Sequence, residues 1–307
     1  MPISLPAQPE AWLLFALLSP LFWALVHILD AYCVERVFTK PWMGVITSSL
    51  ASLVVFLGVP FALPFARWEF DNWHVVELAL LAGTCIQASQ AFYFQALDYS
   101  EAGIVAAYWN LTPTFLPIAS FFILGSVLHV WVYVGIALLI ATSTGFCLID
   151  TNFAARWKSF FLMLIASGFQ TAALMIEDNV FAHSSFLAGF LLVTTGIIIS
   201  GFLPLLLPWV RQAFKAKLQT LKPALGLILF IEVTNLIALM ISQRAIDLGV
   251  PSIVAAVETA IPAYTFVLSS LLFLVTKRYG DEHSRKNLVR KLLLVGVMMA
   301  GMWMVSA

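Results

Sequence analysis

Ten apolar runs, each long enough to cross a bilayer as a helix, are the strongest constraint on how this chain folds. A helix needs about 20 apolar residues to cross a hydrocarbon core of ~30 Å, and it satisfies its own backbone hydrogen bonds in lipid. The runs are too long and too uniform for the strands of a membrane barrel. They lie near residues 11–34, 42–65, 74–98, 102–125, 128–149, 157–182, 186–209, 222–247, 251–276 and 288–306. The sequence therefore predicts an all-α membrane protein with ten transmembrane helices.

Composition and motifs argue against a soluble enzyme. Hydrophobic residues make up 62% of the chain and charged residues 10%, whereas a soluble domain is about half apolar and about a quarter charged. The sequence holds no phosphate-binding glycine loop, zinc-protease motif or nucleophile elbow, and its three cysteines lack the spacing of a metal site. We predict no catalytic residue, metal or cofactor. The expected partners are a small-molecule substrate and the lipid bilayer, not nucleic acid, and the oligomeric state stays open.

One stretch of the chain occurs twice. Residues 96–113 (ALDYSEAGIVAAYWNLTP) and 245–262 (AIDLGVPSIVAAVETAIP) share Ala, Asp, Ile-Val-Ala-Ala and Pro at a constant offset of 149 residues (247 − 98). The offset is about half of the 307 residues, so it indicates a duplicated half. We predict one five-helix repeat over 1–150 and a second over 151–307. Because five is odd, the repeats are inverted, as in transporters whose substrate site lies where the halves meet.

The basic residues of the connecting segments indicate an orientation. Fourteen of the sixteen Lys and Arg residues follow odd-numbered spans, including the run from Arg211 to Lys222 that is expected to connect the seventh and eighth spans. Only Arg67 and Arg244 lie on the opposite side. Cytoplasmic loops carry the excess of Lys and Arg, so both termini are predicted to point away from the cytoplasm. The membrane we expect is the bacterial inner (cytoplasmic) membrane.

Short apolar motifs follow each copy of the repeated stretch. The first half continues from GIVAAYWNLTP (103–113) to VGIALLI (134–140), and the second from SIVAAVETAIP (252–262) to VGV (295–297) and Gly301. With these motifs the chain resembles, over nearly its full length, the drug/metabolite transporter superfamily and specifically its EamA-type ten-helix transporters. The resemblance implies the fold and says little about the substrate. Two features depart from it: Ser126 follows Leu124-Gly125 where the family usually has Glu, and family members usually keep both termini cytoplasmic, so the orientation stays open.

Five carboxylates lie at least four residues from the ends of the predicted spans: Asp30, Glu177, Asp178, Glu232 and Glu258. A charged group in the membrane is costly, so such residues mark substrate or proton pathways. No Lys or Arg lies this far inside a span, and Arg244 lies near a helix end. This acidic interior favours a cationic or zwitterionic cargo, or protons, over an anionic or phosphorylated cargo.

Glu258 is the first candidate for substrate binding. It occupies the position that Trp109 has in the first copy (258 − 149), and inverted repeats bring such positions together at a central cavity. A carboxylate opposite an aromatic ring binds an ammonium group through its charge and the ring quadrupole. Tyr108 and Asn110 flank the tryptophan and Tyr264 follows Glu258, so all three join the predicted site. The alternative is that Glu258 only hydrogen-bonds a neighbouring backbone.

His27, Asp30, Glu177 and Asp178 form a second candidate group, for proton coupling. His27 and Asp30 are three residues apart on one helical face, and Asp30 aligns with Asp178 at an offset of 148 residues (178 − 30). Small shifts carry an imidazole through physiological pH, so a histidine beside carboxylates could relay protons. Alternatively, Asp30 and Asp178 lie near helix ends and pair locally at the membrane interface.

Polar faces on two more spans complete the predicted set. The eighth span carries Glu232, Asn235 and Ser242 on one helical face, and the third span carries Gln87, Gln90 and Tyr93. These faces could line the cavity, with Glu232 and Gln90 binding substrate. They could equally only hydrogen-bond helix to helix.

Together these features predict a secondary active transporter, not an enzyme, that moves a small amine-bearing or zwitterionic metabolite by alternating access, with proton coupling as part of the hypothesis. Three alternatives stay open. A carrier of lipid-linked or nucleotide-conjugated metabolites on the same fold would need fixed positive charge for a diphosphate. An intramembrane enzyme would need a nucleophile paired with a base. A non-transporting membrane partner protein would tolerate the loss of all five carboxylates.

Overall fold

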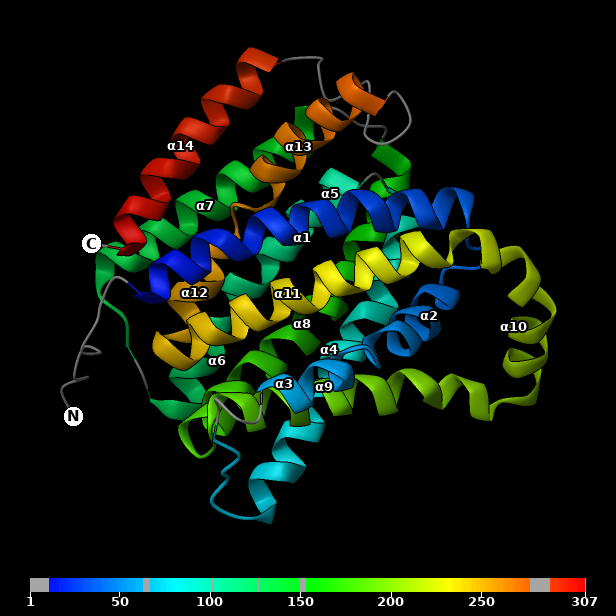
Figure 1. Cartoon of the computed structure of the whole chain (residues 1–307). Coiled ribbons are helices and arrows are strands. Elements are labelled where there is room, and N and C mark those ends of the chain that lie inside the picture. The colour runs from blue at the N-terminus through cyan, green and yellow to red at the C-terminus, as the bar shows by residue number, and fades with distance from the viewer. Residues whose placement is uncertain are drawn as a thin grey trace.

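The chain folds into a bundle of helices (Figure 1). This computed structural model describes residues 11–62, 67–100, 102–125, 127–149, 153–276 and 288–306. The helices are α1 (Ala11–Arg36), α2 (Trp42–Ser52), α3 (Val55–Ala62), α4 (Trp73–Leu97), α5 (Ala102–Tyr108), α6 (Thr112–Leu124), α7 (Val130–Ile149), α8 (Phe153–Ala182), α9 (Phe186–Phe202), α10 (Pro208–Leu221), α11 (Leu225–Leu248), α12 (Pro251–Glu258), α13 (Ile261–Thr276) and α14 (Leu288–Ser306). Short 3₁₀ turns lie at Trp109–Leu111, Leu203–Leu206 and Lys222–Ala224.

Seven helical segments of the described chain are long and apolar enough to cross a membrane. They are Ala11–Arg36, Trp42–Ala62, Trp73–Leu97, Trp157–Ala182, Phe186–Leu206, Pro208–Leu248 and Pro251–Thr276. The outer surface is apolar as well, with Phe122 and Val275 79% and 83% exposed, which suits contact with lipid. The structure thus confirms an all-helical chain with several candidate membrane spans. Ten spans in two inverted repeats stay a prediction.

The long helices pair across the two halves of the chain. α1 and α11 lie side by side and run in opposite directions, as the colours in Figure 1 show. α4 packs against α8 and α9, and α7 packs against α14. The core is therefore built from contacts between segments far apart in sequence, and these contacts position the polar residues described below.

Two glycines let α4 and α9 approach closely. A Cβ built on Gly83 would lie 2.0 Å from the Val193 carbonyl oxygen, and one on Gly196 would lie 2.5 Å from the Leu80 carbonyl oxygen. Small residues are common where membrane helices touch, because association there depends on close van der Waals contact. The Gly83–Gly196 crossing therefore fixes the position of α4.

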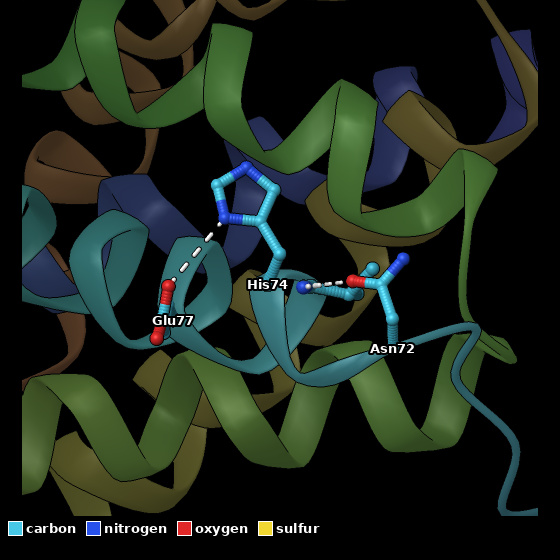
Figure 2. Close-up of polar contacts among 4 residues, drawn as sticks. Asn72, His74 and Glu77 are labelled. Atoms are coloured by element: carbon cyan, nitrogen blue, oxygen red, sulfur yellow. Dashed lines mark hydrogen bonds and ion pairs between the residues drawn. The ribbon is translucent and has the colours of Figure 1, made fainter.

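The start of α4 shows why the helix begins where it does (Figure 2). Asn72 has an extended backbone and its Oδ1 accepts a hydrogen bond from the Val75 amide at 3.3 Å, which satisfies one of the unpaired donors of the first turn. His74 and Glu77 approach to 3.5 Å in the same turn, but both side chains are more than 70% exposed (73% and 78%). This His is a surface residue and not part of a polar centre.

The basic segment from Arg211 to Lys222 connects α9 and α11, as expected from the sequence, and it is itself mostly helical. Its first eleven residues belong to α10, which crosses one end of the bundle between α9 and α11 (Figure 1). Val210, Phe214 and Leu221 are buried against α2 and α11, while the basic side chains between them are exposed. The apolar residues recur at helical spacing, and that spacing gives the helix a face to bury.

Candidate functional site

Both copies of the repeated stretch form a helix that breaks at the same point. In the first copy α5 ends at Tyr108, a 3₁₀ turn follows, and α6 begins at Thr112. In the second copy α12 ends at Glu258 and α13 begins at Ile261. The second residue of each following helix is a proline, a position where the missing amide hydrogen costs no helical hydrogen bond. The equivalent residues Trp109 and Glu258 therefore both lie at helix breaks.

A cavity lies between these breaks, with about 740 Å³ of space that protein atoms do not fill, part of it open to solvent. Residues of both halves line it: Trp23, His27, Ile86, Gln90, Trp109, Thr112, Gln170, Leu174, Glu177, Leu239, Ser242, Gln243, Ala255, Glu258, Thr259 and Ile261. We call this the first cavity. Its lining combines aromatic and aliphatic side chains with polar side chains that face the same space.

Glu258 is held in place by the first helix. Ser19 on α1 donates a hydrogen bond of 2.7 Å to Glu258 Oε1, although the two residues are 239 positions apart. Trp109 lines the same cavity, as predicted from the repeat, and its ring lies 5.9 Å from that of Tyr93. The cavity therefore offers a carboxyl group and the indole rings of Trp109 and Trp23 to one ligand.

Glu177 supplies a second carboxyl group to the first cavity. Its side chain is 1% exposed, and Gln243 on α11 donates a hydrogen bond to its Oε1. The Oε1 of Gln243 and the hydroxyl of Thr112 are buried and have no hydrogen-bond partner among the described residues. A buried polar atom without a partner costs free energy, so both atoms are suited to a ligand or water in the cavity. Neither Lys nor Arg occurs among the described residues that line it.

A buried hydrogen-bonded chain joins His27 to Asp30 through Tyr93. The Nδ1 of His27 lies 2.7 Å from the Tyr93 hydroxyl, which donates a hydrogen bond of 3.1 Å to Asp30 Oδ2. All three side chains are buried, with exposures of 3%, 1% and 7%. His27 also lies beside Trp23, with ring centroids 6.4 Å apart. The sequence placed His27 and Asp30 on one helical face, and the structure shows that Tyr93 on α4 connects them.

Asp30 and Glu232 line a second, smaller cavity between α1, α2, α4 and α11, with about 360 Å³ of space that protein atoms do not fill, part of it open to solvent. Glu232 Oε1 accepts hydrogen bonds from Ser52 at 2.6 Å and from Asn235 at 3.0 Å. Gln90 lines both cavities. Glu232, proposed from the sequence as a substrate ligand with Glu258, therefore lies in a different cavity from Glu258.

Three residues of the predicted site do not line either cavity, and a fourth is not described. Tyr264 packs against the hydrophobic core around α12, and the ring of Tyr108 packs against Phe160. Asp178 is partly buried but is not among the lining residues. The side chain of Asn110 lies outside the described part of the structure.

Sequence reasoning assigned no role to Ser19, Ser52, Gln243 or Thr112. Each is a polar residue inside an apolar run, but so are many residues that only hydrogen-bond their own helix, such as Thr47 and Thr142. The sequence pattern therefore does not separate polar residues that bond another helix from those that bond their own. Tyr93 was placed on the polar face of the third span with Gln87 and Gln90, but its link to His27 and Asp30 was not predicted.

Comparisons with known proteins agree with this architecture. The sequence model of the EamA-like transporter family matches residues 10–147, and this family is part of the drug/metabolite transporter superfamily. A protein crystal structure superposes with a TM-score of 0.65 at 11% identity, and the match covers 96% of each chain. At this identity the likeness shows the fold alone. No curated protein matches the sequence.

Proposed function

Because residues 10–147 belong to the EamA-like transporter family, we propose that this protein is a secondary transporter that carries a small cationic amine across a membrane by alternating access. The family consists of transporters and not of enzymes, and it suggests a small-molecule substrate. The cargo follows from one observation: Glu258 and Glu177 line the first cavity, and the described lining residues include no Lys or Arg.

The first cavity fits an ammonium group better than a zwitterion. Glu258 accepts hydrogen bonds from Ser19 and Ser242, and Glu177 accepts one from Gln243. A carboxylate has about four acceptor sites, so each group keeps acceptor capacity for a ligand donor. Trp23 and Trp109 offer ring faces, which attract a cation most strongly when water is excluded. A zwitterion would bring its own carboxylate beside two acidic side chains without a fixed cation. An amine without a carboxylate meets the two acidic side chains and the indole rings, and no like charge among the described lining residues.

Helix pairing supports the proposal of two inverted five-helix repeats, over 1–150 and 151–307. If the halves are copies, α1 corresponds to α8 and α4 corresponds to α11. α1 packs against α11, and its counterpart α8 packs against α4. The breaks at Trp109 and Glu258 are likewise equivalent. Broken helices that meet near the midplane are a known arrangement for substrate sites in such transporters.

Orientation is proposed from the end of the bundle that carries α10. Arg36, Lys40 and the exposed basic side chains of α10 gather at this end, where α10 packs against the start of α2. The excess of Lys and Arg marks the cytoplasmic side. We place this end in the cytoplasm, in a bacterial inner membrane, with both chain termini toward the opposite side.

Proton coupling is proposed for the His27–Asp30 group and for Glu177. Their buried positions next to the cavities place titratable groups beside the transport path. Asp178 lies one residue beyond Glu177 and is kept as a secondary contributor because its side chain is only partly buried. A carboxyl group that alternately binds a proton and the cargo amine couples the two fluxes.

The test is transport in proteoliposomes that contain a trapped pH dye, challenged with alkylamines, amino acids, sugars and sugar phosphates. We expect proton movement with amines and its loss in Glu258→Gln and Trp109→Ala. Glu77→Gln is the matched control, since Glu77 is exposed and remote from the cavities. Normal transport by both cavity variants would overturn the site assignment. Transport of sugar phosphates alone would favour the alternative of an anionic or nucleotide-conjugated cargo.

A further inference from the structure

The second cavity lies toward the end of the bundle that carries α10. On α1, the first cavity is lined by Trp23 and His27, whereas the second is lined by Val26 and Asp30 and, just beyond the end of α1, by Phe38. Phe38 also packs in the cluster that Val210 and Phe214 of α10 form. The second cavity therefore occupies the space between the first cavity and the basic end.

A hydrogen-bonded link joins the two cavities. His27 lines the first cavity, Asp30 lines the second, and the Tyr93 hydroxyl contacts both at 2.7 Å and 3.1 Å. Tyr93 is 1% exposed, so water has almost no access to its side chain. Since each contact is within hydrogen-bond distance, protons can pass along the chain without a bridging water.

The second cavity has groups suited to proton exchange. Asp30 and Glu232 both line it, and the Oδ1 of Asn235 is buried without a hydrogen-bond partner among the described residues. An unpartnered acceptor beside two carboxyl groups fits a water molecule or hydronium that donates to it. The cavity offers no Lys or Arg among its described lining residues, so a mobile cation must balance any negative charge there.

We propose that His27, Tyr93 and Asp30 form a proton relay between the first cavity and the second, and that the Asp30–Glu232 pair exchanges protons with the α10 side. This inference rests on the proposed proton coupling. It assigns Tyr93 a role as the central carrier, and it assigns Glu232 to proton exchange and not to cargo binding. The amine then enters the first cavity while its coupled proton leaves through the second.

The transfer balances as a concerted shift of three protons. One proton binds His27 Nε2 from the first cavity as the Nδ1 proton moves to the Tyr93 oxygen. The Tyr93 hydroxyl proton moves to Asp30 Oδ2 in the same step. One O–H or N–H bond forms for each that breaks, Asp30 ends as a carboxylic acid, and Tyr93 and His27 both end neutral. Because the Tyr93 hydroxyl donates its hydrogen bond to Asp30, the proton moves from Tyr93 to Asp30.

The titratable groups around the relay come from four other helices besides α1. α1 adds Cys33 to His27 and Asp30, α4 contributes Tyr93, and α11 contributes Glu232. Glu177 on α8 and Glu258 on α12 face the His27 end across the first cavity. A chain of imidazole and phenol groups can pass protons but not Na⁺, so the relay assigns protons as the coupling ion.

Tyr93→Phe tests the relay, because it removes the hydroxyl and keeps the ring. In proteoliposomes challenged with the same panel of amines and amino acids, we expect proton flux to fall roughly tenfold or more while cargo counterflow continues. Tyr99→Phe is the control, since Tyr99 is 42% exposed and lies outside both cavities. Wild-type proton coupling that survives unchanged in Tyr93→Phe would overturn the relay and leave the proposed function standing. Cargo movement without protons in the wild type, or with Na⁺ in their place, would overturn both proton coupling and the relay.

A second measurement needs no cargo. Infrared difference spectra between two pH values report the Asp30 carboxyl band, assigned with Asp30→Asn, and the His27 ring bands, assigned with His27→Gln. If Tyr93 connects the two groups, Tyr93→Phe shifts both sets of bands and Tyr99→Phe shifts neither. A shift confined to one group would show that the chain is interrupted, and the relay would be wrong.

Discussion

Replacing Gly83 by Ala tests the packing that positions α4. The new Cβ would lie 2.0 Å from the Val193 carbonyl oxygen and 2.7 Å from the Ile197 amide nitrogen, both backbone atoms. Ordinary contact begins at 3.4 Å, so α4 and α9 must separate by about 1.4 Å (3.4 − 2.0). Backbone atoms cannot rotate away as a side chain does. The whole crossing has to adjust.

The expected cost combines two opposing effects. Overpacking of a tight contact costs about 1–3 kcal/mol, and a clash with two backbone atoms belongs at the upper end of this range. Ala is favoured over Gly in a helix by about 1 kcal/mol, which offsets part of the cost. We expect a net destabilisation of ~2 kcal/mol and a melting temperature lower by roughly 5 °C.

The assay is thermal unfolding of the purified protein in detergent, followed by loss of monodisperse protein. Gly168→Ala on α8 is the matched control, because a Cβ there has no neighbour within 4 Å. It should melt at or slightly above the wild-type temperature. If Gly83→Ala melted as high as Gly168→Ala, the close α4–α9 crossing would be wrong. Transport should also decline in Gly83→Ala, since α4 carries Gln90 and Tyr93.

Three further predictions concern the cavities and the orientation. Glu258→Gln should abolish amine-driven flux while Glu258→Asp keeps a measurable part of it; equal activity of both in a proteoliposome assay would contradict a charge-based role. Gln243→Leu removes the donor to Glu177 and leaves a buried acceptor unpaired, so it should destabilise the protein by about 1–3 kcal/mol. The detergent melt measures this change, and an unchanged melting temperature would refute the contact. Lys217→Cys on α10 should react with a membrane-impermeant maleimide only from the cytoplasmic face; labelling from the outer face would reverse the proposed orientation.

The position of the candidate site could be predicted from the sequence where the argument depended on the stretch that occurs twice. The shared motif at a constant offset put Glu258 opposite Trp109, and both residues line one cavity at matching helix breaks. Similar stretches share local backbone preferences, including the proline that follows each break. Glu232 shows the limit of this reasoning, because helical spacing defined its face but not the cavity that this face meets.

The kind of secondary structure and the identity of the carboxyl groups buried in the membrane follow from the sequence alone. Apolar runs of bilayer length must form helices, and the carboxylates within them must serve a purpose or find partners. These conclusions depend on neighbouring residues of one run, so no tertiary contact is needed to reach them. The amphipathic helix α10 was missed because its basic residues dominated the segment and hid the spacing of Val210, Phe214 and Leu221.

Which polar side chains contact one another follows only from the packing of the whole bundle. Ser19 reaches Glu258 across 239 positions, and Tyr93 connects His27 with Asp30 from a different helix. A periodic pattern fixes which residues share a face, but the helix opposite that face is chosen by packing throughout the bundle, as at the Gly83–Gly196 crossing. The division of the polar interior into two cavities joined at Tyr93 is therefore a property of the fold, since hydrogen-bond partners depend on where distant helices lie.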